Sequence, residues 1–221
     1  MPTRAKPAFL LTRPEDDSRR FAALLPDLPV VISPIIRIVP LPHDREALLR
    51  APALVFTSGH AIAAAGEGRG RRAYCVGPRT AELARLAGFD VVQGPGDAEG
   101  LLPILQAAPE PLVHPHGRHL AKVLPVQGVV VYDQQPLALS DQARALLQAE
   151  TPVILPLFSP RSARLVAAQV TDARAPLWVA SISKAAQRGF SAPCERMIVA
   201  PTPDAAGLAA SIRHMLTGEQ S

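Results

Sequence analysis

The chain has 221 residues, of which 48% are apolar and 19% are charged, and this composition excludes an intrinsically disordered chain. Aromatic residues make up 4% and the net charge is +4, which argues against nucleic-acid binding and suits a small polyanionic ligand. No apolar run approaches the roughly 20 residues of a membrane span.

The first predicted strand, residues 8–11, is also the apolar core of a basic N-terminus. It is shorter than the roughly 7–15 apolar residues of an export signal, so we expect a cytoplasmic protein. Cys75 and Cys194 are then expected to be reduced thiols. Pro14 and the acidic residues that follow it predict the start of a helix that runs to about Leu25.

Beyond this point, short apolar strands alternate with helices. The pattern predicts strands at 30–32, 35–39, 53–56, 73–76, 91–92, 112–113, 129–132, 153–157, 178–180 and 197–200. Helices are predicted around 61–65, 81–87, 98–107, 118–124, 141–150, 164–168, 184–188 and 205–216. Such alternation is typical of an α/β fold with parallel sheets, which bind ligands beyond the carboxyl ends of their strands.

The junction between a strand and a hydroxyl residue occurs twice. Ser58 in VFTSGH (55–60) is matched 101 residues later by Ser159 in LFSPRS (157–162), and the surrounding signals recur in the same order over residues 53–107 and 153–216. This points to two similar lobes, although unrelated βα units also resemble one another.

The lobe boundaries follow from the number of strands available. Residues 1–34 are expected to complete the sheet of a lobe formed with 137–221, while 41–128 form an inserted lobe. The chain would cross between the lobes at 35–40 and 129–136, two extended β-branched runs suited to pairing as a two-stranded hinge.

The ordered set FLLTRP, ALVFTSGHAI, AYCVGPRTAELARLAGF, VVVYDQQP and LFSPRSARL resembles the uroporphyrinogen-III synthase family over nearly the whole chain. The resemblance implies two flavodoxin-like lobes joined by a two-stranded β-ladder. It also implies cyclisation of linear hydroxymethylbilane to uroporphyrinogen III, with inversion of ring D, loss of water, and neither cofactor nor metal. The second turn, Ser181 to Ala185 (SISKA), departs from the pattern that Gly77, Pro78, Thr80 and Ala81 keep.

The implied reaction asks the protein mainly to position its substrate. The substrate carries eight carboxylates, and its hydroxymethyl group leaves as water to give an electrophilic azafulvenium that ring D attacks. The interlobe tyrosine of the family falls on Tyr132, whose phenol would donate a proton or hydrogen bond to the departing hydroxyl. The alternative role for Tyr132 is a half-buried strand residue that fills the hinge.

Hydroxyl groups at helix starts are the expected carboxylate ligands, because free backbone N–H groups there attract anions. The alternative is that these residues only cap helices. Arg13 would reach the same cleft, unless it merely pairs with the acidic residues after it. The predicted substrate-binding residues are Arg13, Thr57, Ser58, Thr80, Ser159, Ser181 and Lys184, with Ser183, Arg118 and Arg161 as weaker candidates.

Two motifs suggest other chemistry and do not support it. HPHGRH (114–119) lacks a regular metal-ligand spacing, and Pro115 and Gly117 should break regular structure, so a loop at the cleft or in solvent is expected. GEGRG (66–70) lacks the lysine of a phosphate-binding loop.

Two rival functions remain at this point: a two-lobed small-anion-binding protein without catalysis, and a nucleotide-binding regulatory module. As an enzyme the chain would be a monomer. Its partners would be the polycarboxylate tetrapyrrole and the preceding enzyme, which forms hydroxymethylbilane, with no nucleic acid or membrane involved.

Overall fold

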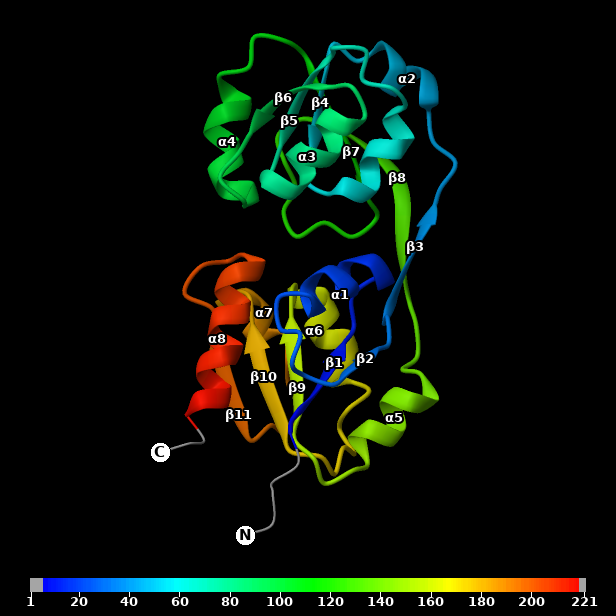
Figure 1. The fold of residues 1–221 in the computed structure, drawn as a ribbon. Helices are drawn as coiled ribbons and strands as arrows, with labels where there is room; N and C mark the ends of the chain where they lie inside the picture. The colour runs from blue at the N-terminus through cyan, green and yellow to red at the C-terminus, as the bar shows by residue number, and fades with distance from the viewer. Residues whose placement is uncertain (1–5, 219–221) are drawn as a thin grey trace. The chain divides into compact units, whose positions relative to one another are not determined.

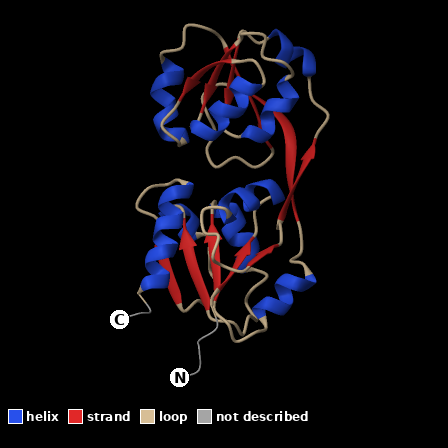
Figure 2. Ribbon diagram, viewed as in Figure 1, coloured by secondary structure: helices blue, strands red, loops and turns tan. Residues whose placement is uncertain are grey.

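A computed structural model describes residues 6–218, and in it the chain divides into two units. Met1–Arg37 and Pro136–Ser221 form the terminal unit, and Ile38–Gln135 form the inserted unit. Each unit contains a mostly parallel β-sheet covered by helices, so the predicted α/β class with two parallel sheets is confirmed (Figures 1 and 2).

The terminal unit contains a five-stranded parallel sheet in the order β11-β10-β9-β1-β2. Its strands are β1 (Ala8–Leu11), β2 (Val30–Ile32), β9 (Val153–Leu157), β10 (Leu177–Ser181) and β11 (Arg196–Val199). Its helices are α1 (Glu15–Ala22), α5 (Asp141–Leu147), α6 (Pro160–Ala167), α7 (Lys184–Arg188) and α8 (Ala205–Thr217).

Alternating side chains of these strands fill two cores, one on each face of the sheet. Phe9 and Leu11 pack in one core with α1 and α8, while Leu10 packs in the other with α5, α6 and α7. All four residues of β1 are buried, as expected for a parallel strand covered on both faces.

The inserted unit contains most of a six-stranded sheet in the order β3-β8-β7-β4-β5-β6. The strands are β3 (Ile36–Pro40), β4 (Ala53–Phe56), β5 (Arg72–Cys75), β6 (Asp90–Gln93), β7 (Leu112–Gly117) and β8 (Gln127–Pro136). Helix α2 (Arg45–Arg50), the 3₁₀ helix η1 (Gly59–Ala65) and α3 (Pro78–Leu86) pack on one face, and α4 (Ala98–Gln106) packs on the other.

Two local predictions in the inserted unit are wrong. Residues 118–124 form no helix, and this segment instead packs Leu124 in the core beside α4. The prediction also missed α2, which begins after Asp44, whose carboxylate accepts a hydrogen bond from the Ala47 N–H at 2.9 Å.

The HPHGRH segment also differs from the predicted irregular loop, because residues 114–117 lie in β7. Strand β7 pairs with β4 through Leu112 and Val113, before the proline. The missing N–H of Pro115 therefore removes no ladder bond on that side, which explains how a proline fits in this strand.

Candidate functional site

Six of the eight predicted site residues lie at the carboxyl edges of the two sheets, and Tyr132 and Thr80 lie close to one of them. In the terminal unit, Arg13 follows β1, Ser159 follows β9, and Ser181 ends β10, three strands that are neighbours in the sheet. In the inserted unit, Thr57 and Ser58 follow β4, and Thr80 lies in the first turn of α3, after β5. Because these strands are parallel, the topology brings each set to one edge of its own sheet.

Thr57 makes the best-defined polar contact at the edge of the inserted unit. Its Oγ1 lies 2.9 Å from Nε2 of His114, whose exposed fraction is 2%. Burial, together with the nearby His116, lowers the pKa of His114 from 6.5 to about 4, so its imidazole is neutral at neutral pH. The rings of His114 and His116 lie 4.8 Å apart between their centroids.

Tyr132 lies on β8 opposite Gly117 of β7. The pairing shifts register here, since His116 pairs with Val130 and Gly117 with Tyr132. A β-bulge of this kind turns side chains out of strict alternation, and Val131 and Tyr132 accordingly pack in the same core.

The tyrosine is 5% exposed, and no hydrogen bond to its hydroxyl is found among residues 6–218. The ring of His60 meets its ring edge-on at 5.9 Å. Tyr132 is therefore more enclosed than the half-buried hinge residue considered from the sequence.

The predicted serines at the strand ends cap helices. Ser58 accepts a hydrogen bond from the His60 N–H at 3.3 Å, at the start of a 3₁₀ helix where an α-helix was expected. Ser159 accepts from the Ser162 N–H at 3.1 Å, and Ser183 accepts from the Ala186 N–H at 3.2 Å. A capping oxygen keeps its own O–H group, so it remains a potential donor.

Ser181 behaves differently from the capping serines. It is fully buried at the end of β10, and its hydroxyl has no hydrogen-bond partner among the described residues. An unpaired buried hydroxyl destabilises a fold unless something else compensates for it. Lys184, three residues later, is exposed as the first residue of α7.

Arg13 is held over an aromatic ring at the edge of the terminal unit. Its guanidinium carbon lies 4.4 Å from the centroid of Phe158, and its Nη2 lies 3.0 Å from Oδ2 of Asp17. Burial lowers the pKa of Arg13, and Asp17 opposes this effect. The predicted ion pair therefore exists, and the stacking on Phe158 is an additional contact.

The remaining candidates contribute less to these edges. Thr80 is 7% exposed in the first turn of α3, and Arg161 lies in α6. Arg118 is exposed, and its Nη1 lies 3.2 Å from Asp133. Burial raises the pKa of the Cys75 thiol to about 11, which makes it a poor nucleophile.

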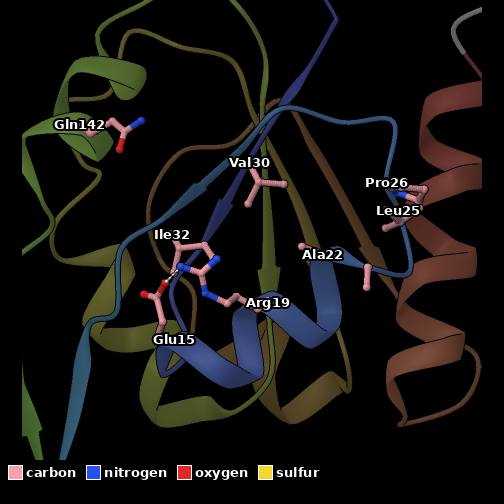
Figure 3. Close-up of a pocket in the computed structure, with 9 residues that line it drawn as sticks. Glu15, Arg19, Ala22, Leu25, Pro26, Val30, Ile32 and Gln142 are labelled. Atoms are coloured by element: carbon pink, nitrogen blue, oxygen red, sulfur yellow. Dashed lines mark ion pairs between the residues drawn. The ribbon is translucent and has the colours of Figure 1, made fainter.

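A pocket of about 590 Å³ lies elsewhere in the terminal unit, between α1, β2 and α5 (Figure 3). None of the predicted site residues lines it, and Glu15 and Arg19 form an ion pair on its wall at 2.6 Å. Within residues 6–218, no cluster of histidine, cysteine and carboxylate side chains suits a metal ion, and no helix is long and apolar enough to cross a membrane.

Comparisons with known proteins agree on one family. The family model described as uroporphyrinogen-III synthase HemD matches residues 27–210. A search of curated proteins found no significant match.

Solved structures show the same fold at low sequence identity. A uroporphyrinogen-III synthetase from Helicobacter pylori is 14% identical with a TM-score of 0.65, covering 96% of this chain and 100% of its own. A mutant uroporphyrinogen III synthase from the extremely thermophilic bacterium Thermus thermophilus is 14% identical with a TM-score of 0.55, covering 96% of this chain and 99% of its own.

Proposed function

Because the chain belongs to the uroporphyrinogen-III synthase family, we propose that the carboxyl edges of its two sheets bind and fold its substrate. The reaction is the cyclisation of linear hydroxymethylbilane to uroporphyrinogen III, with inversion of ring D and loss of water, in porphyrin and haem biosynthesis. The chain is thus a lyase. The match of the family model over residues 27–210 carries this conclusion.

The chemistry asks for positioning more than for a strong acid or base. Loss of water from the hydroxymethyl group gives an azafulvenium whose reactivity is intrinsic to the pyrroles. The enzyme must bring the substituted carbon of ring D to this electrophile before the simpler closure occurs. Holding reacting groups in place contributes roughly 7–11 kcal/mol in favourable cases, which is enough to select one closure over the other.

Tyr132 is the proposed general acid. Its phenol O–H donates a proton or a hydrogen bond to the departing hydroxyl. The hydroxyl of Tyr132 has no partner among the described residues, which leaves it available as a donor. Its enclosure by the core around Val131 supports this role, because a donor acts more strongly where water is excluded.

The substrate carboxylates are assigned to the edge residues of both sheets. Arg13 offers a guanidinium already fixed over Phe158, and Ser181 offers a buried hydroxyl whose missing partner a carboxylate would supply. Hydroxyl groups of the strand-end residues and the exposed ammonium of Lys184 complete the proposed set: Thr57, Ser58, Thr80, Ser159 and Lys184.

The proposal extends to the organisation of the chain. Residues 1–34 with 137–221 form one lobe, 41–128 form the other, and 35–40 and 129–136 join them as a two-stranded ladder. The enzyme works as a cytoplasmic monomer and receives its unstable substrate from the enzyme that forms hydroxymethylbilane. Two neighbouring hydrogen-bonded strands, β3 and β8, support the joining role.

The deciding experiment separates the product isomers. The protein is incubated with enzymatically made hydroxymethylbilane, and the products are resolved by chromatography. Predominant uroporphyrinogen III is the expected result. Only the I isomer, as in a reaction without the protein, would leave an anion-binding protein as the better description.

A further inference from the structure

The two faces of β7 contact two residues of the proposed site, Thr57 on one face and Tyr132 on the other. Successive side chains of a strand alternate between faces, so His114 and His116 share one face while Val113 and Gly117 share the other. His114 meets Thr57 on the first face, and Gly117 lies against Tyr132 on the second. Nothing in the family assignment gives residues 114–117 a role.

His114 fixes the hydroxyl of Thr57 from its buried side. Thr57 is half-buried, whereas His114 is 2% exposed, so the imidazole forms the inner half of this contact. At neutral pH the ring carries one proton, and its Nε2 forms a single hydrogen bond with Thr57 Oγ1. When Nε2–H donates to that oxygen, the O–H of Thr57 is left to donate outward to a carboxylate.

Gly117 makes room for the ring of Tyr132. A Cβ at position 117 would lie 2.5 Å from Cε2, 2.6 Å from Cζ and 2.9 Å from the hydroxyl oxygen of Tyr132. These distances are far below van der Waals contact, so any side chain here would displace the phenol. The β-bulge that pairs Gly117 with Tyr132 brings the ring to this space.

We propose that residues 114–117 of β7 position the reacting and binding groups of the enzyme, with His114 orienting the Thr57 hydroxyl and Gly117 seating the Tyr132 phenol. The inference rests on the proposed roles of Thr57 and Tyr132. Neither His114 nor Gly117 touches the substrate; both act through their neighbours.

The first test is a double-mutant cycle between His114 and Thr57. His114→Leu should raise KM roughly three- to tenfold with little change in kcat, the loss expected for one hydrogen bond. His114→Gln, which retains an N–H donor at similar reach, should recover most of the affinity. Thr57→Val should raise KM by a similar factor, and the double variant should be no worse than Thr57→Val alone.

The outcomes of this cycle distinguish the positioning role of His114 from the substrate-binding role of Thr57. Additive losses, or a normal KM in His114→Leu while Thr57→Val is impaired, would overturn the positioning role and leave substrate binding by Thr57 intact. A normal KM in Thr57→Val would overturn both. Melting temperatures of all variants show whether a change in KM merely follows unfolding.

The second test concerns Gly117. Gly117→Ala should lower kcat as much as Tyr132→Phe does, and adding it to Tyr132→Phe should cost little further activity. Gly218→Ala, whose added Cβ would meet only the carbonyl oxygen of His214 at 3.5 Å, is the matched control. A Gly117→Ala enzyme with normal kcat would overturn the seating role, and an active Tyr132→Phe enzyme would overturn the role of Tyr132 with it.

Discussion

The carboxyl edges of the two sheets hold their polar groups in different ways. In the inserted unit, the strands themselves supply the contacts: β7 meets Thr57 through His114 and Tyr132 through Gly117. In the terminal unit, the groups are held by helix starts and an aromatic ring, as Ser159 caps α6 and Arg13 stacks on Phe158. Thr57 and Tyr132 of the inserted unit are thus placed by contacts with a neighbouring strand, whereas Ser159 and Arg13 of the terminal unit are placed by a helix start and an aromatic ring.

Replacing Tyr132 with phenylalanine is the most direct test of its proposed role as the general acid. Loss of a general acid lowers kcat by roughly a hundredfold or more, while substrate binding should be nearly unchanged because the ring remains in its core. Single-turnover kinetics with hydroxymethylbilane measure both. Unchanged turnover would show that Tyr132 only packs in the core of the inserted unit and takes no part in the reaction.

The buried histidine of the inserted unit should leave a pH signature in stability. The folded-state pKa of His114 is about 4 against 6.5 in the unfolded chain, because of burial and the neighbouring His116. As pH falls from 6.5 to 4, His114 takes up a proton in the unfolded chain before it does so in the folded protein. The contribution of His114 to the free energy of unfolding therefore decreases by up to about 3 kcal/mol. Above pH 6.5 it is fully retained.

Denaturant unfolding of the wild-type protein and of His114→Gln at several pH values checks this prediction. The stability difference between them should change in this window, since other titrating groups are common to both. A constant difference between wild type and His114→Gln would mean that His114 is not held neutral.

Removing the Arg13 side chain tests the proposed carboxylate binding at the carboxyl edge of the sheet in the terminal unit. Arg13→Ala should raise KM roughly tenfold, because a charge-assisted hydrogen bond to a carboxylate is lost. Arg20→Ala is the matched control, since Arg20 also pairs with Asp17 but does not lie on the Phe158 ring. Equal effects of the two variants would show that Arg13 serves only the ion pair with Asp17.

Alanine substitutions at Ser58 and Ser159 test whether these serines only cap helices or also bind the substrate. Ser58→Ala and Ser159→Ala should each lower stability by about 1 kcal/mol through loss of a cap. Weaker substrate affinity in addition would show a binding role. A lower melting temperature alone would leave capping as the whole role of that serine.

Ser181→Ala is expected to have the smallest effect on the fold. Its hydroxyl has no partner among residues 6–218, so its removal should leave the melting temperature unchanged or slightly higher, while substrate affinity falls. Ser183→Ala, which removes the cap of α7, is the contrast and should lower the melting temperature. A destabilised Ser181→Ala protein with normal affinity would contradict the binding assignment.

Much of the fold could be predicted because its signals are local. The buried strand 8–11 occurs where its apolar run predicts it, and α4 and α8 lie within one residue of the helices predicted at 98–107 and 205–216. The short helix α2 escaped because six residues do not display a helical period. The predicted helix at 118–124 is absent, and Leu124 of this segment packs in the core beside α4 instead.

The amino-acid sequence by itself determined the alternation of strands and helices, the hydroxyl groups at strand ends and the family. These depend on residues near one another in the chain or on the order of motifs. Only the tertiary structure decided that His114 meets Thr57, 57 positions away, and that Gly117 lies beside Tyr132. Register, a bulge and the burial of one ring arise from strand pairing between distant segments, and local sequence patterns do not encode such pairing.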